Sequence, residues 1–196
     1  HGVFMKFKYG MLVGGKSIHL RVAADVIEQS IEEFELAGGC FDPKTFSNVP
    51  SFKIDQRVYA DAGFANEVLV GICVFFSTWM GNKILDELYD KSLKFSFKRF
   101  TQAFRADKRC AENQISLLAC TYFSDIDLTV AIRLTSRDKL EEEQRNSLFK
   151  QAHLNAAQFI SENGKQAPVH YYHIQNGTLN LEPLLKESIE QIQREK

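Results

Sequence analysis

Residues 115–134 read ISLLACTYFSDIDLTVAIRL and predict the clearest pair of strands in the chain. Between Ile126 and Leu134, apolar side chains alternate with polar or small ones, which is typical of a strand with one buried face. The apolar run Ile115–Phe123 precedes that strand, and Ser124-Asp125 supplies the residues of a turn. The two segments therefore predict an antiparallel hairpin.

The N-terminal part of the chain predicts the same hairpin, followed by a helix. Phe4–Val13 alternates around lysines, Gly14-Gly15 can turn the chain, and Lys16–Leu20 can return as a short strand. Apolar residues then recur at helical spacing until Gly38-Gly39, where the helix is expected to end.

The next unit follows the same plan. Phe52–Ala60 and Phe64–Val70 predict a hairpin around Asp61–Gly63. A mostly apolar stretch comes next, and we expect a helix from about residue 71 to residue 90.

Two more helices and one more hairpin complete the pattern. After the 115–134 hairpin, Ser136 or Asp138 can cap a long helix that ends at Asn163-Gly164. Asn176-Gly177 is a strong hairpin signal between Val169–Gln175 and Thr178–Leu181. Pro183 then suits the first turn of a terminal helix.

These units predict an α+β fold, in which repeated ββα units merge into an antiparallel sheet with helices packed mainly on one face. The composition, 44% hydrophobic and 25% charged, supports a sizeable core. No Pro/Gly/Ser-rich linker divides the chain, so we expect a single domain over residues 1–196. Two tightly packed halves, 1–112 and 113–196, are the alternative.

Residues 9–20, YGMLVGGKSIHL, contain a match to the consensus sequence of a P-loop. Residues 10–17 fit the pattern G-x-x-x-x-G-K-[ST], and Gly10, Gly15, Lys16 and Ser17 would be the nucleotide-binding residues. The residues around the motif favour a hairpin turn instead. The strand before it alternates with lysines, and bulky residues occupy the loop, where phosphates need close backbone approach.

A basic, aromatic segment, KSLKFSFKRFTQAFRADKR, spans residues 91–109. It holds seven Lys and Arg residues against one acidic residue, on a chain of formal net charge −1. As a helix, it places Leu93, Phe97, Phe100 and Phe104 on one stripe, which we interpret as core. The residues predicted to bind an anionic partner lie roughly opposite and are Lys94, Lys98, Arg105 and Arg109, with Phe95 among them.

The uncharged stretch at residues 68–81, VLVGICVFFSTWMG, raises the question of a membrane. As a helix it would span only about 21 Å, against a hydrocarbon core of about 30 Å. We expect a buried element in Val68–Met80. Peripheral membrane contact through residues 68–109 remains an alternative because the basic segment follows closely.

The sequence contains no residue pattern that is typical of a metal-binding or catalytic site. His170 and His173 differ by an odd number on a predicted strand, so they would point to opposite faces. Asp125 and Asp127 fit a turn and the polar face of a strand. We predict no metal site, no cofactor and no catalytic residues.

The leading functional hypothesis is a non-catalytic binding or regulatory protein that contacts an anionic partner through the helix at 91–109. A protein, a nucleic acid or an anionic lipid could be that partner. A P-loop nucleotide-binding protein and a membrane-peripheral protein are the alternatives. Four cysteines without a C-x-x-C pair favour free thiols and a cytoplasmic location.

Overall fold

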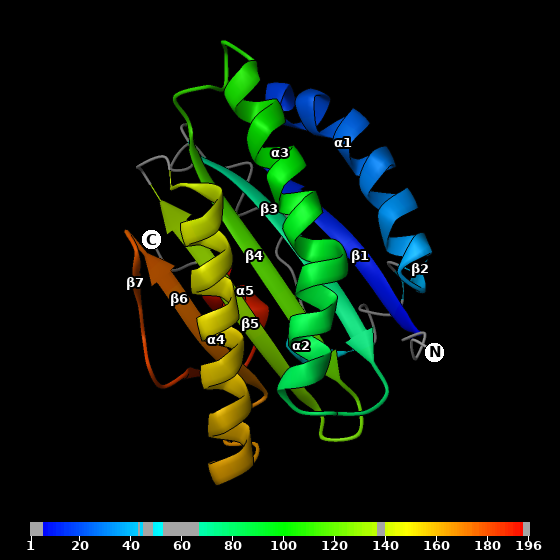
Figure 1. Cartoon of the computed structure of the whole chain (residues 1–196), viewed down its shortest axis with the longest axis vertical. Helices are drawn as coiled ribbons and strands as arrows, with labels where there is room; N and C mark the ends of the chain where they lie inside the picture. Colours follow the sequence, from blue (N-terminus) through cyan, green and yellow to red (C-terminus); the bar gives the residue numbers. More distant parts are fainter. Residues whose placement is uncertain (1–5, 43, 45–48, 53–66, 137–139, 194–196) are drawn as a thin grey trace.

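The computed structural model describes residues 6–42, 44, 49–52, 67–136 and 140–193. In this part of the chain, eight strands form one sheet of order β2-β1-β3-β4-β5-β6-β7, with β8 also paired to β6 (Figure 1). The strands are β1 (Phe7–Gly14), β2 (Gly39–Phe41), β3 (Glu67–Phe76), β4 (Gln114–Phe123), β5 (Leu128–Ser136), β6 (Val169–Gln175), β7 (Thr178–Leu179) and β8 (Leu184–Lys186). The helices are α1 (Ser17–Leu36), the short 3-10 helix η2 (Pro50–Phe52), α2 (Asn82–Leu88), the π-helix η5 (Tyr89–Leu93), α3 (Lys94–Ala106), α4 (Glu142–Asn163) and α5 (Ile189–Gln193).

Helical crossovers join parallel neighbours in this sheet. Strands β1 and β2 are parallel and connected by α1, β3 and β4 by α2, η5 and α3, and β5 and β6 by α4. Antiparallel pairing of β1 with β3 and of β4 with β5 links each unit to the next. The predicted antiparallel sheet of ββα units is therefore wrong. The fold is α+β in general terms, but the sheet is mixed, because a crossover helix returns the chain to the end where the previous strand began.

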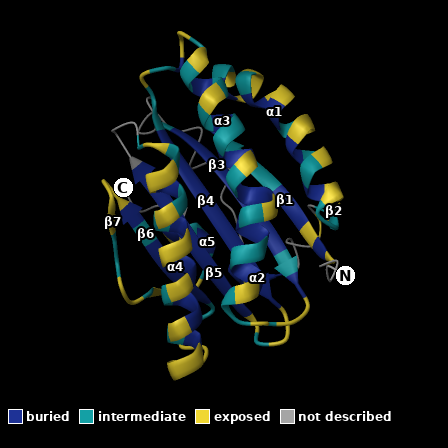
Figure 2. Cartoon of the chain, in the orientation of Figure 1, coloured by how far each residue is buried: buried dark blue, intermediate teal, exposed yellow. Residues whose placement is uncertain are grey.

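The sheet has two buried faces, which are covered differently (Figures 1 and 2). Helices α1, α2, α3 and α4 pack on one face, which we call the helix face. Alternate residues of the five long strands, such as Val70 and Ile72 of β3, join the core there with the aromatic side chains of these helices. The opposite face, which we call the second face, is covered by Val49, Phe52 and the α5 residues Ile189 and Ile192.

The hairpin predicted at Gly14-Gly15 does not form, because Ser17 already begins α1. The imidazole of His19 folds back, and its Nδ1 accepts a hydrogen bond from the Lys16 backbone N–H at 2.9 Å. Gly15 has a φ of +149°, and a Cβ there would lie 2.3 Å from His19 Nδ1. Glycine is therefore needed for the tight passage from strand to helix.

The stretch for which a helix from residue 71 is predicted is instead the strand β3, and the helix begins only at Asn82. Residues Val68 to Val74 are buried on both faces of the sheet. A strand that is covered on both sides reads as a continuous apolar run without a period of two, so it resembles a buried helix. Val68–Phe76 therefore belongs to the core, as expected, but the end of the predicted buried stretch does not, since Ser77 and Thr78 are exposed and Met80 is 59% exposed.

The other two predicted hairpins are confirmed. Strands β4 and β5 pair antiparallel from Ile115–Ser136 to Phe123–Leu128, around a turn at residues 124–127. Strands β6 and β7 pair around Asn176 and Gly177, whose φ values are +50° and +79°. Positive φ at both positions is what a type I′ turn requires.

The two C-terminal helices differ from their predicted bounds at their starts. Helix α4 ends at Asn163 with Gly164 in a positive-φ conformation, as predicted, but it begins at Glu142 rather than near residue 136. Leu184–Lys186 is the strand β8, so the predicted terminal helix is limited to Ile189–Gln193. Pairing of β8 with the edge of β6 has displaced the first turn of that helix.

Most of the hairpin predicted from Phe52–Ala60 and Phe64–Val70 lies outside the described residues. The single-domain prediction stays a prediction. The parallel pair of β3 and β4 continues one sheet across the boundary between residues 112 and 113 that the alternative would require.

Candidate functional site

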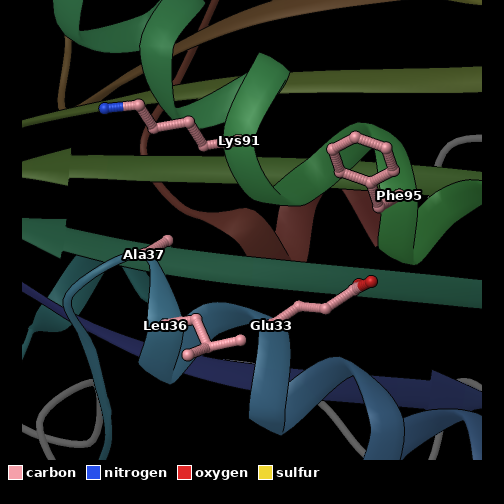
Figure 3. A pocket seen from close by; sticks show the side chains of 5 residues that line it. All are labelled: Glu33, Leu36, Ala37, Lys91 and Phe95. Carbon is pink, nitrogen blue, oxygen red and sulfur yellow. The ribbon is translucent and has the colours of Figure 1, made fainter.

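An open groove lies between the C-terminal end of α1 and the turn from η5 into α3 (Figure 3). Its volume is about 320 Å³, and it is lined by Glu33, Leu36, Ala37, Lys91 and Phe95. Leu36 is 82% exposed and Phe95 is 41% exposed. Two large apolar side chains are therefore left in contact with water on opposite sides of one groove.

The amphipathic pattern of α3 explains why Phe95 is exposed. Leu93, Phe97, Phe100 and Phe104 are fully buried, which confirms the predicted core stripe. Phe95 lies two positions from Phe97, which places it about 200° around the helix and away from the core. The exposed ring is thus a consequence of where the other aromatic side chains pack.

Each residue of the predicted anion-binding set already has a partner within the chain. Lys94 Nζ lies 3.7 Å from Asp90, and Lys98 Nζ lies 3.0 Å from Glu142. Arg109 is paired with Asp107 at 2.7 Å. When the acidic partners of these cations are included, the surface around α3 therefore carries much less net positive charge than the sequence of residues 91–109 indicates.

Arg105 bonds the backbone of a neighbouring loop instead of pairing with an acidic side chain at the surface. Its guanidinium donates to the backbone carbonyls of Ala111 and Asn113, the second at 2.8 Å. Burial lowers the pKa of this group, and the charge of Glu112 partly offsets that effect. Arg105 thus fastens the loop that connects α3 to β4, about 15 Å along the helix from Phe95.

The surface next to the groove combines cations with the aromatic ring. Lys94 Nζ lies 5.1 Å from the centroid of the Phe95 ring, within the range of a cation–π contact. On the α1 side, Arg99 bonds Glu33 at 2.6 Å. The second carboxylate oxygen of Glu33, Oε2, is buried and has no hydrogen-bond partner among the described residues.

The residues of the P-loop pattern are placed on three different parts of the β1–α1 connection. Gly10 pairs with Cys73 within the sheet, Gly15 makes the turn, and Lys16 and Ser17 stand at the start of α1. Pairing with β3 continues to Gly14, so only Gly15 and Lys16 separate the strand from the helix. The order of strand and helix resembles a P-loop, but this connection is too short to wrap a phosphate. Nucleotide binding stays a prediction that this geometry does not favour.

The histidine pair is separated as the sequence predicts. His170 contacts Phe159 of α4 on the helix face, and His173 Nε2 lies 3.2 Å from Thr135 Oγ1 on the second face. Asp125 accepts from the Trp79 N–H, and Asp127 from the Tyr122 hydroxyl. Within the described ranges, no group of three or more His, Cys, Asp or Glu residues could hold a metal ion.

A buried polar network on the second face was not predicted. It runs from Glu67 through Arg133 (3.1 Å) to Ser116 (2.8 Å), then to Thr135 (3.3 Å) and His173 (3.2 Å). Arg133 is only 5% exposed and also donates to the carbonyl of Ile192 in α5 at 3.2 Å. The sequence signal was an arginine within the alternation of β5, on the side opposite the apolar residues.

Comparisons with known proteins give no further information on this arrangement. No family model matches the chain, and neither the curated proteins nor the solved structures contain a match. Across the described residues, no helix has both the length and the apolar character needed to cross a bilayer. The functional argument therefore depends on the geometry of this chain alone.

Proposed function

We propose that this is a non-catalytic binding protein that contacts an anionic partner through the exposed side of α3. The observation that supports it is Phe95, 41% exposed at the edge of the α1–α3 groove and flanked by Lys91, Lys94 and Lys98. Aromatic side chains are enriched at the centres of binding surfaces, where they supply large contact areas.

The ion pairs of these lysines do not prevent binding. The side chains of Lys91, Lys94 and Lys98 are between 29% and 49% exposed, and so are their acidic partners. Pairs of this kind stabilise a fold by about 0–1 kcal/mol each, so a phosphate or carboxylate can displace the internal partner at little cost.

Single-stranded nucleic acid fits this surface better than anionic lipid or an acidic protein. A flat ring held beside an ammonium group is the arrangement on which bases stack, and stacking is worth about 1–3 kcal/mol per base. The cytoplasmic location belongs to the same proposal and is supported by Cys73 and Cys120, which are adjacent in the sheet yet remain free thiols.

A salt titration with labelled single- and double-stranded oligonucleotides tests the proposal. The Lys94→Glu/Lys98→Glu variant should bind more weakly and lower the slope of log K against log salt by about 0.7 per lost contact with a single strand. The matched control is Arg21→Glu/Lys165→Glu, which makes the same charge change at exposed residues outside the lining of the groove. It should change the slope by much less.

Phe95→Ala tests the stacking part separately. Affinity for single strands should fall while affinity for duplexes stays the same, because duplex bases are not available to stack. No binding by the parent protein at low salt, or equal losses in the groove and control variants, would contradict the proposal.

A further inference from the structure

Two cysteine side chains lie next to one another within the sheet. Cys73 of β3 and Cys120 of β4 are directly opposite partners in parallel strands that run side by side (Figure 1). Both belong to the core of the second face, where Cys73 is 5% exposed and Cys120 is 1% exposed. Side chains at paired positions of neighbouring strands point to the same side of the sheet, so the two thiols form a buried pair.

The two thiols of this pair interact directly. Both are free of disulfides, and they share a hydrogen bond. Burial raises the pKa of the Cys120 thiol, and the hydrogen bond with Cys73 raises it further, so this thiol keeps its proton until a ligand displaces it. On either side of the pair, at the same level of the sheet, stand Gly10 of β1 and Ala131 of β5. Neither has a side chain larger than a methyl group, so the adjacent strands do not crowd the sulfur atoms.

The spacing of the two strands suits an ion held between the sulfur atoms. Neighbouring strands of a sheet lie about 4.7–4.9 Å apart. A bond from a metal ion to a thiolate is about 2.3 Å long, so two such bonds in line span about 4.6 Å. An ion in line between the thiolates of Cys73 and Cys120 therefore requires little movement of the backbone of β3 or β4.

The number and the charge of the ligands select the kind of ion. Zn²⁺ takes four ligands in its structural sites. In the part of the chain that the structure describes, no three His, Cys, Asp or Glu residues are grouped so as to hold a metal. Thiolates prefer soft ions, and Hg²⁺ is satisfied by two thiolates in line. Two thiolates also neutralise a divalent ion, which favours it here because a net charge is costly to bury among apolar side chains.

We propose that Cys73 and Cys120 form a two-coordinate site for a soft divalent metal ion. Each sulfur atom forms one bond to the ion and loses its proton to the solvent, so Hg²⁺ and two thiols give a neutral bis-thiolate and two protons. Cys73 is the more exposed of the two and is the thiol that an entering ion meets first. The pair is on the second face and the α1–α3 groove is on the helix face, so this inference does not depend on the proposed binding of an anionic partner.

Native mass spectrometry of the reduced full chain tests the site, with one equivalent of Hg²⁺ and about 0.1 mM glutathione as a competing thiol. The parent should retain one Hg²⁺ per chain with the loss of two protons. Cys73→Ala and Cys120→Ala should each retain at least about tenfold less, because a single thiolate lacks the high effective concentration of a second one beside it. Zn²⁺ should not be retained under the same conditions, because the pair supplies only two of the four ligands that it needs.

Two other cysteines supply matched control variants. Cys110 is buried and Cys40 is exposed, and both are free thiols outside the pair. Cys110→Ala and Cys40→Ser should therefore retain Hg²⁺ like the parent. Hg²⁺ should also raise the melting temperature of the parent in the same buffer, since a ligand that binds the folded chain stabilises it.

Four results would overturn the proposal. The first is a parent chain that retains no Hg²⁺, and the second is a Cys73→Ala or Cys120→Ala variant that retains as much as the parent. The third is retention of Zn²⁺ to the same extent as Hg²⁺, which would contradict a site with two ligands. The fourth is a lower melting temperature with Hg²⁺, which would show that the ion is captured by thiols that become accessible only on unfolding.

Discussion

The helix face and the second face of the sheet are both buried, but different side chains fill them. The strands present almost only apolar side chains to the helix face, where Phe97, Phe100 and Phe104 join the same core, although His153 and His170 are also buried there. The second face carries the buried Glu67–Arg133 ion pair and its hydrogen-bond network. Burial of apolar area stabilises without needing partners, whereas buried charges must be paired. The comparison indicates that the larger apolar core lies on the helix face, whereas the second face buries the charged Glu67–Arg133 pair.

The largest expected effect is on the helix face. Phe100→Ala should lower the free energy of unfolding by about 3–5 kcal/mol, because the ring is fully buried and its removal leaves a cavity. Urea unfolding measures this change, with Phe95→Ala as the matched substitution on the exposed side of the same helix. A similar loss in both variants would show that the two sides of α3 do not differ as described.

Breaking the ion pair of the second face should come next. Glu67→Gln removes the carboxylate that bonds the buried Arg133 at 3.1 Å, and we expect a loss of about 2–3 kcal/mol in the free energy of unfolding. Arg133→Met with Glu67→Gln removes both charges and should recover part of that loss. A double variant less stable than Glu67→Gln would mean that the pairing of the two charges is not what stabilises this face.

Acid should destabilise the helix face through His153. Burial lowers the pKa of this imidazole to about 3, while Asp90 raises it slightly and Lys150 lowers it further. Since the unfolded chain binds a proton near pH 6.5 and the folded chain does not, stability falls as the pH falls through that value. Between about pH 7.5 and pH 5 the loss should be about 2 kcal/mol. His153→Leu should remove this part of the pH dependence measured by urea unfolding, and an unchanged slope would contradict the assignment.

The exposed ion pairs should matter least for stability. Glu142→Gln breaks the contact with Lys98, and because both side chains are 40% exposed, the free energy of unfolding should change by less than about 1 kcal/mol. A melting curve like that of the parent is the expected result. A loss as large as that of Glu67→Gln would remove the distinction between surface and buried pairs.

Lys16→Ala tests whether the connection between β1 and α1 acts on nucleotides. We expect no ATP binding detectable by calorimetry in the parent or in the variant, because pairing with β3 continues to Gly14. Micromolar binding by the parent that the substitution abolishes would instead favour the P-loop alternative.

The sequence predicted elements well where a turn or a stop is encoded locally. The β4–β5 and β6–β7 hairpins and the end of α4 at Gly164 depend on nearby residues with restricted backbone preferences. The sequence-based predictions were wrong where tertiary packing determines the local structure. Lys16 is at the N-cap of α1 instead of the usual serine or aspartate, and His19 three residues later replaces the usual Glu or Gln that bonds back to it, so the helix start was not recognised. Burial of β3 on both faces removed the periodicity that identifies a strand.

The candidate sites were predicted only in part, for a similar reason. The buried stripe and the exposed Phe95 follow from helical spacing. The acidic partners Asp90 and Glu142 could not be assigned, because pairing between elements depends on tertiary packing. The network on the second face joins side chains of β3, β4, β5 and β6, and no local pattern indicates how they pair.

The order of the strands has a consequence for assembly of the chain. Strands β1, β3, β4, β5 and β6 follow one another in the sheet as they do in the sequence. Each of these five strands can therefore pair with the one of the five made just before it, without inserting between strands already formed. Until β6 pairs, β5 is an exposed edge with unpaired backbone groups, open to pairing with another chain. The stage between synthesis of β5 and docking of β6 is the point at which aggregation during translation should be greatest.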